Sequence, residues 1–211
     1  MLHARTLTAE DAVSTIALDL IADSVLLPPP ALPAAATLEK ALKARRSARS
    51  FAPEALPLET VSTLLWAAFG VNRRDGDGRT APSAHGWREI EPYVVLAEGA
   101  YRYDAGAHRL DLVKAEDLRA LTGTQSFVAS APLNLVYVAE FARVQGVRAD
   151  EREFLVGADA GCVAQNVYLC CAALGLATVV RGLVDRRALA HALGLSATQR
   201  IALAQSVGGA H

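Results

Sequence analysis

Helical and strand-like segments follow one another along this chain without the regular strand–helix–strand repeat that builds a parallel sheet. An amphipathic helix precedes three short strands, a fourth strand, a long helix and a final strand–helix–strand unit. These segments lie at residues 57–70, 92–99, 100–105, 108–113, 133–140, 150–174, 177–184, 185–194 and 200–209. Turn residues separate the three short strands, which favours an antiparallel meander. We therefore expect an α+β fold, with a mostly antiparallel central sheet flanked by helices.

The helical segments carry signals of their own. Thr37 can cap a helix over residues 38–46, with Glu39 well placed in its first turn. In the helix closed by Gly70, apolar residues at i, i+3, i+4 and i+7 form one stripe. These residues are Val61, Leu64, Leu65 and Ala68. The spacing predicts a helix that packs one face on the core.

The long helix expected over residues 150–174 contains small residues in its interior: Gly157, Ala158, Gly161 and Ala164. A glycine inside a helix costs about 1 kcal/mol relative to alanine. Two of them suggest a close approach to another element, either within one subunit or between two copies.

A proline-rich stretch, LLPPPALPAAA, divides the chain near residue 36. Each proline removes a hydrogen-bond donor and fixes φ, so this stretch should be extended and not helical. We expect residues 1–36 to be an N-terminal arm and linker, and residues 37–211 to form the functional domain.

The composition excludes several classes of protein. The 211 residues are 52% hydrophobic, enough for one substantial core, and the net charge of −1 gives no basic field for nucleic acid. We expect Cys162, Cys170 and Cys171 to be buried structural thiols in a reducing cytoplasm. The N-terminus lacks a secretion signal, and no uninterrupted apolar run reaches the roughly 18 residues of a membrane span.

Common catalytic motifs are absent from the sequence. There is no G-x-S-x-G, no H-E-x-x-H, no C-x-x-C and no acidic calcium loop, so neither a hydrolase nor a metal site is indicated. G-x-G-x-x-G and the Walker phosphate loop are also missing. Ser83 and His85 are neighbours, but no motif supplies an acid for a catalytic triad.

One cluster remains, in the stretch ALKARRSARSF. Arg45, Arg46 and Arg49 surround Ser47, and arginine forks with a hydroxyl between them can bind a phosphate. If the helix continues through Arg49, Arg45 and Arg49 share one side. The alternative is a solvated basic face with some pairing to Glu39. Sequence physics indicates an anion site but does not choose between these two.

Five segments together resemble the nitroreductase family of FMN-dependent oxidoreductases. They are RRSARSF, LLWAAFGVNR, RTAPSAHGWREIEPYVV, GADAGCVAQNVYLCCAALGL and ATVVRGLV, and the likeness covers about residues 37–209. The resemblance implies the family's FMN-binding fold and a homodimer with FMN at the subunit interface.

The resemblance also implies a role for each matching position. Arg45 and Arg49 would neutralise the FMN phosphate, and Arg46 and Ser47 would bond the ribityl chain and the ring edge. The ring would pass beside Pro82, Ser83 and Ala84, and backbone amides of Arg181 and Gly182 would approach its N5 and O4 atoms. No side chain need act as a catalytic residue, because the cofactor carries the chemistry.

The chain departs from the family's pattern at three places. Many relatives have asparagine at the position of Gly86 and glutamine at that of Arg88, so those side-chain contacts are not carried over. His85 and Arg88 are candidates for substrate contacts. Many relatives also have a basic residue beyond the last strand, whereas this chain has no lysine or arginine after Arg200. Arg73 and Arg74 are candidates to replace that phosphate contact.

The function implied is transfer of a hydride from NAD(P)H, through FMN, to a nitroaromatic, a quinone or a similar small-molecule acceptor. Two alternatives stay open. One is a flavin-dependent dehydrogenase of azoline rings in peptides, because GVNRRDGDGRTAPSA is similar to a segment of such family members. The other is a flavin-binding or small-anion-binding protein without turnover. Partners expected are a second copy and a small acceptor, with neither nucleic acid nor membrane.

Overall fold

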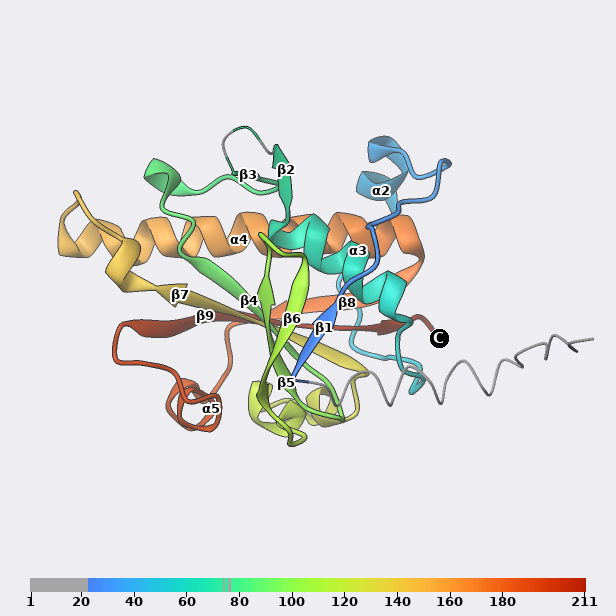
Figure 1. The fold of residues 1–211 in the computed structure, drawn as a ribbon. Helices are drawn as coiled ribbons and strands as arrows, with labels where there is room; N and C mark the ends of the chain where they lie inside the picture. The colour runs from blue at the N-terminus through green and yellow to red at the C-terminus, as the bar shows by residue number, and fades with distance from the viewer. Residues whose placement is uncertain (1–22, 74, 76) are drawn as a thin grey trace, which may run out of the picture.

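A seven-stranded antiparallel sheet forms the centre of the protein (Figure 1). The structure is a computed structural model and describes residues 23–73, 75 and 77–211. The strands are ordered β1-β6-β5-β4-β7-β9-β8. Their bounds are β1 Ser24–Leu26, β4 Ile90–Val95, β5 Ala100–Asp104, β6 Arg109–Lys114, β7 Leu133–Glu140, β8 Leu176–Arg181 and β9 Gln199–Gly209. The α+β fold and the meander of β4, β5 and β6 are confirmed.

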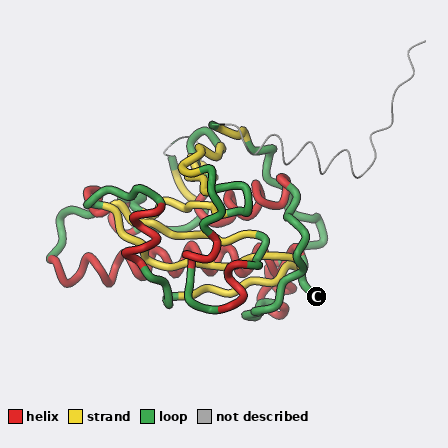
Figure 2. Tube along the Cα trace, turned by 90° about the horizontal axis from the view of Figure 1, so that it is seen from below, coloured by secondary structure: helices red, strands yellow, loops and turns green. Residues whose placement is uncertain are grey.

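Helices cover both faces of this sheet (Figures 1 and 2). The long helix α4 lies across one face beside α3, and α5 lies on the opposite face. The helices are α2 Leu38–Ala44, α3 Leu58–Phe69, α4 Ala149–Leu174 and α5 Arg186–Ala192. Short 3₁₀ turns are η1 Ala84–Gly86, η2 Arg119–Thr122, η3 Ser126–Ala129 and η4 Phe141–Arg143.

Strand β7 shows how the sheet separates two hydrophobic cores. Successive side chains of a strand point to opposite faces. Leu135 and Tyr137 join the core under α3 and α4, whereas Val136 and Val138 join the core that contains Leu189 of α5. Since both faces are covered, β7 is a continuous apolar run and not an alternating one.

The predicted helices form, and one of them, α2, ends two residues before its predicted end. All four residues of the α3 stripe are buried, and α4 begins one residue before the expected range. The helix predicted over residues 38–46 ends at Ala44 instead, because the backbone at Arg45 has a ψ of 121°. The segment predicted as a loop over residues 71–87 contains a small hairpin, β2 Val71–Arg73 with β3 Gly78–Arg79, followed by η1.

The proline-rich stretch is extended, as expected, and packs on the domain. Strand β1 pairs with β6 at the edge of the sheet, so the sheet includes a strand that precedes residue 36. Ser62 donates a hydrogen bond to the Pro28 carbonyl, and the Ala31 amide donates one to Thr63 at 3.1 Å. Residues 1–22 of the expected arm lie outside the described residues.

Helix α4 is long and apolar enough to cross a membrane by length and composition alone. It contains an 18-residue window of mean hydropathy 1.3, although no uninterrupted apolar run predicts a span. Half of that window is buried inside the protein, where α4 packs on the sheet and on α3. The core helix of a globular domain has the same length and composition, so this feature is weak support for a membrane span.

Candidate cofactor site

The arginine cluster lies on an extended segment that leaves α2 and runs beside β8. The Ala48 amide donates a hydrogen bond of 2.9 Å to the Thr178 carbonyl, and Ala52 forms an isolated bridge with Gly209. The segment therefore covers part of the outer edge of β8. Because α2 ends at Ala44, the condition under which Arg45 and Arg49 would share one helical side is not met.

Tyr168 of α4 connects this segment to the end of β8. Its hydroxyl lies 2.8 Å from the Ser47 hydroxyl and accepts a hydrogen bond of 3.0 Å from the Val180 amide. The guanidinium of Arg45 stands 5.2 Å above the Tyr168 ring, within the range of a cation–π contact. With the Val180 amide donating to it, the tyrosine hydroxyl can donate to Ser47, which leaves the serine proton for an outside acceptor.

No acid among the described residues neutralises the charge of the three arginines. In the described part of the chain, Arg45, Arg46 and Arg49 form no ion pair, while Glu39 is held by Lys43 at 2.5 Å. The pairing with Glu39 that the alternative of a solvated basic face included is not among the ion pairs of the described residues. A cavity of about 330 Å³ opens beside Arg45 and Arg46. Two unpaired guanidinium groups beside an open cavity, with a third on the same segment, fit an anion such as a phosphate.

Arg181 and Gly182 lie directly after Val180, so Tyr168 brings them close to the cluster. The side chain of Arg181 points into the protein, where it donates to the Thr122 carbonyl at 2.6 Å and to Asn134 Oδ1 at 2.9 Å. Burial lowers the pKa of Arg181 to about 10. Only the backbone here can face a ligand, which fits the backbone role implied by the resemblance.

The loop from Ser83 to Arg88 is held by two carboxyl groups. Ser83 Oγ donates to Glu89 Oε2 at 2.9 Å, and the Ala84 amide donates to Asp159 Oδ2 at 2.7 Å. The φ angles of His85, Gly86 and Arg88 are 53°, 68° and 52°. A positive φ is strained for residues other than glycine, so the loop needs these anchors.

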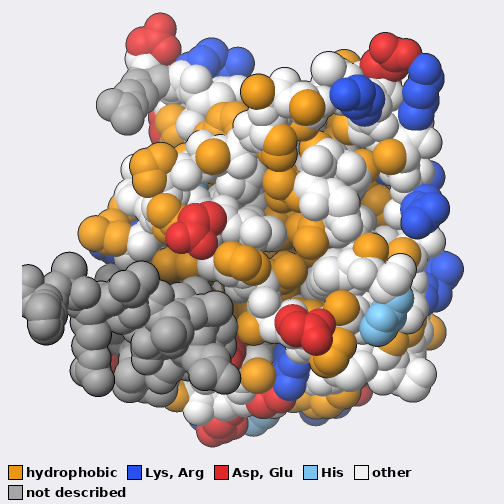
Figure 3. All heavy atoms as spheres, turned by 90° about the vertical axis from the view of Figure 1, so that its right-hand side faces the viewer, with side chains coloured by type: hydrophobic (Ala, Val, Ile, Leu, Met, Phe, Trp, Pro, Cys, Tyr) orange, Lys and Arg blue, Asp and Glu red, His pale blue; other side chains and the backbone are white. Residues whose placement is uncertain are grey.

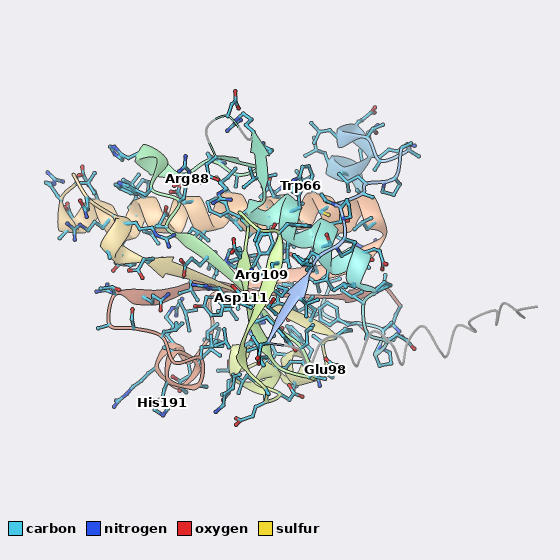
Figure 4. The ribbon with its side chains drawn as sticks, in the orientation of Figure 1. Trp66, Arg88, Glu98, Arg109, Asp111 and His191 are labelled. Atoms are coloured by element: carbon cyan, nitrogen blue, oxygen red, sulfur yellow. The ribbon has the colours of Figure 1, made fainter. Side chains whose placement is uncertain are left out.

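The two candidate substrate residues of this loop have partners within the chain. His85 stacks on Trp87 with ring centroids 4.8 Å apart. Arg88 forms an ion pair of 3.4 Å with Asp77 and lies above the N-terminal half of α4 (Figure 4). Pro82 is exposed at the start of the loop.

The loop and the arginine cluster lie at different places along α4. Asp159, which holds the loop, and Tyr168, which holds the cluster, are nine residues apart. An α-helix rises 1.5 Å and turns 100° per residue, so the two are about 14 Å apart and on opposite sides of the helix. Figure 1 shows η1 over the N-terminal half of α4 and α2 over its C-terminal end. A single chain does not bring Pro82, Ser83 and Ala84 to the cluster.

Arg73, one candidate for a replacement phosphate contact, does not join the cluster. Arg73 is in β2, and the space beside Gly78 is filled by its guanidinium. Arg74 lies outside the described residues. A metal site was not expected, and residues 23–73, 75 and 77–211 hold no group of three or more histidine, cysteine, aspartate or glutamate residues suited to a metal ion.

Sequence reasoning missed Tyr168, Glu89 and Asp159. Asp159 had a visible signal, since it is an acid among small and apolar residues inside a helix. Glu89 and Tyr168 carried no such signal, because their partners lie on other elements.

The prediction of buried thiols holds for two of the three cysteines. Cys170 and Cys171 are buried, which raises the pKa of both, whereas Cys162 is half-buried.

Comparisons with known proteins identify the family to which this fold belongs. The model of the nitroreductase family matches residues 42–209. A Methanocaldococcus jannaschii protein named as a nitroreductase is 36% identical over 155 residues, which cover 69% of this chain and 78% of that protein. The crystal structure of a Ralstonia eutropha protein, also named as a nitroreductase, is 45% identical with a TM-score of 0.86 and covers 90% of this chain and 91% of its own.

Two more distant solved structures share the fold. The Escherichia coli microcin synthetase McbBCD complex contains a chain 18% identical with a TM-score of 0.68, covering 97% of this chain and 95% of that one. The NADPH:FMN oxidoreductase of Vibrio harveyi is 20% identical with a TM-score of 0.61, covering 82% and 68%. The match over residues 42–209 spans most of the sequence. The chain belongs to the nitroreductase family.

Proposed function

We propose that this protein is an FMN-dependent oxidoreductase that takes electrons from NAD(P)H and gives them to a small-molecule acceptor. Membership of the nitroreductase family supports oxidoreduction driven by a flavin. One observation carries the choice of FMN: in the described part of the chain, Arg45, Arg46 and Arg49 form no ion pair, and the first two line a cavity next to β8. FMN supplies hydride and electron transfer when it is bound.

The chain's own residues would bind and orient that cofactor. Arg45 and Arg49 provide positive charge for the phosphate, and Arg46 and Ser47 provide further donors. Backbone amides at Arg181 and Gly182 provide donors for the ring, where fixed donors stabilise developing negative charge. Tyr168 orients Ser47 and fixes the end of β8 in the same contact.

A second copy of the chain would complete the site. Pro82, Ser83 and Ala84 lie about 14 Å along α4 from the contacts of the cluster, so we propose that they serve the partner's cofactor. The α4 glycines support a dimer: a Cβ added at Gly157 or Gly161 would meet nothing within 4 Å in the same chain. Gly157 and Gly161 therefore do not serve packing within one subunit, whereas Ala164 is buried in the core, and family members are commonly dimers.

Exposed apolar surface supports the same proposal. Hydrophobic side chains gather on the face that carries α2 (Figure 3). The exposed large residues of that part of the chain are Leu32, Leu38 and Leu42. A groove of about 330 Å³ runs between α2, α3 and α4. Apolar patches of this kind mark interfaces more often than free surface.

A nitroaromatic or a quinone is the acceptor class we propose, and the buried thiols suit a reducing cytoplasm. The second candidate is oxidation of azoline rings in a peptide. Similarity to a chain of the microcin synthetase complex favours it, since that complex holds a truncated pro-microcin B17 and the likeness spans nearly all of both chains.

The purified protein should be yellow, and NADH or NADPH should bleach its flavin absorbance. Addition of a quinone or nitroaromatic should restore the colour. Steady-state rates should give parallel double-reciprocal lines, because donor and acceptor would use one site in turn. Absorbance spectra measure the bleaching and the recovery of the flavin, and initial rates give the pattern of the lines. A protein that binds FMN but is not reduced by either nucleotide would favour the azoline dehydrogenase or a binder without turnover.

Replacing Cys170 with alanine should leave the FMN content and the turnover unchanged, apart from some loss of stability. Burial raises the pKa of this thiol to about 12, so it stays protonated and unreactive at neutral pH. Flavin absorbance and turnover of the folded variant are the measurements. A folded variant that keeps FMN and loses turnover would give this thiol a part in the chemistry.

A further inference from the structure

Two buried acids meet behind the loop from Ser83 to Arg88. Glu89 directly precedes β4 and is fully buried, and Asp159 of α4 is 6% exposed. Neither forms an ion pair in the described part of the chain. Two buried carboxylates without a cation repel each other, so such a pair retains a proton.

The surroundings of Glu89 favour its neutral form. Burial is the main cause that raises its pKa to about 7, and the negative charge of Asp159 adds to the effect. A backbone hydrogen bond and the Ser83 hydroxyl act in the opposite direction but do not cancel it. Glu89 Oε1 is buried without a hydrogen-bond partner among the described residues. A proton on this oxygen would let it donate to Asp159.

The other charged groups near the pair have partners of their own. In the loop, His85 stacks on Trp87 and Arg88 pairs with Asp77. From η4, Arg143 binds Glu91 at 2.6 Å and the Arg88 carbonyl at 2.8 Å. Glu140, beside Glu89 in the sheet, accepts from the Ala142 amide. Asp159 is thus the charged group that acts most directly on Glu89.

Both acids anchor the start of the strained loop, and Glu89 also reaches its end through Ser83. Glu89 accepts from the Ser83 hydroxyl, which in turn accepts from the Arg88 amide at 2.8 Å, and Asp159 accepts from the Ala84 amide. If both acids were ionised, repulsion would move them apart, and at least one of these anchors would lengthen. The positive φ angles would then lose the contacts that hold them.

We propose that Glu89 and Asp159 are positioning residues that share one proton, and that this proton keeps the Ser83–Arg88 loop in the shape that contacts the cofactor. Loss of the proton in mildly alkaline solution loosens the loop and weakens cofactor binding. The inference rests on the proposed function for the cofactor, but its effect on the loop does not need a bound cofactor.

The test compares the wild type with Glu89→Gln, which has nearly the same shape, is neutral at every pH and keeps a donor for Asp159. Wild-type affinity for FMN should fall about tenfold between pH 6 and pH 9, whereas Glu89→Gln should keep the low-pH affinity throughout. Fluorescence titration of FMN measures this. Glu98→Gln is the matched control, since Glu98 lies at the far side of the sheet (Figure 4), and it should retain the wild-type dependence.

A second readout is independent of the cofactor. Hydrogen exchange of the Ala84 amide in the flavin-free protein should accelerate above pH 7 beyond the intrinsic pH effect in the wild type but not in Glu89→Gln. Asp159→Asn should also remove the dependence, although it weakens the Ala84 anchor. An unchanged pH dependence in Glu89→Gln, by either readout, overturns the proposal. Failure of the wild type and of every variant to bind FMN at any pH overturns the proposed function instead. The hydrogen-exchange result then tests on its own whether the shared proton holds the loop.

Discussion

Replacing Arg45 with alanine should lower the affinity for FMN about 10- to 100-fold. A hydrogen bond from a charged group contributes about 1.5–3 kcal/mol, and about 1.4 kcal/mol corresponds to a factor of ten in affinity. Arg45 has no acidic partner in the described part of the chain, so no ion pair within the protein is lost with it. Fluorescence titration of the flavin-free protein with FMN is the measurement.

Riboflavin separates a phosphate contact from general damage at this site. Riboflavin lacks the phosphate, so its affinity should barely change in Arg45→Ala. Arg45→Lys should recover only part of the FMN affinity, because a point charge lacks the fork of the guanidinium. Arg187→Ala, an exposed arginine of α5, should bind both ligands as the wild type does. Equal weakening of FMN and riboflavin would assign Arg45 to the Tyr168 contact and not to the phosphate.

Replacing Gly161 with leucine should weaken dimerisation about 30- to 20,000-fold. Forcing a larger side chain into a packed contact costs about 1–3 kcal/mol, and a two-fold dimer meets the change twice. FMN content should fall with the dimer, since both copies would contribute to each site. Sedimentation over a range of concentrations, with flavin absorbance, measures the two effects together.

The single chain should tolerate this substitution well. A Cβ at Gly161 meets nothing within 4 Å, and leucine favours a helix by about 1 kcal/mol relative to glycine. The thermal unfolding temperature of the monomer should therefore not fall. Arg187→Leu adds an apolar side chain on α5, away from α4, and should leave the dimer intact. If Gly161→Leu remains a flavin-loaded dimer, this face of α4 is not the interface.

Local periodicity predicted most of the fold. The α3 stripe and the runs that became β4 to β9 reflect neighbours along the chain, and those signals are present in the sequence. The end of α2 was not predictable in this way. Arg45 and Arg46 are good helix formers, and no glycine or proline stops the helix there. The helix ends because the following segment bonds to β8, where Ala48 reaches Thr178.

The candidate site was predicted only in part, for a similar reason. The charge of Arg45, Arg46 and Arg49 is visible in a nearly neutral chain, and the resemblance gave it a role. Tyr168 was not visible, because its contact with Ser47 joins residues 121 positions apart. Glu89 was missed because an acid before a strand is usually solvated, and burial beside Asp159 is a property of the folded chain alone.

The place of β9 in the sheet sets the order in which the chain can fold during synthesis. Strand β9 lies between β7 and β8 and pairs with both, although it is made after them. During synthesis, β7 therefore lacks one of its two neighbouring strands until residues 199–209 are available. Over the same period β8 lacks the one strand with which it pairs in the sheet. An apolar strand exposed in this way invites pairing with other chains. Chains truncated before residue 199 should thus depend on chaperones far more than the 211-residue chain.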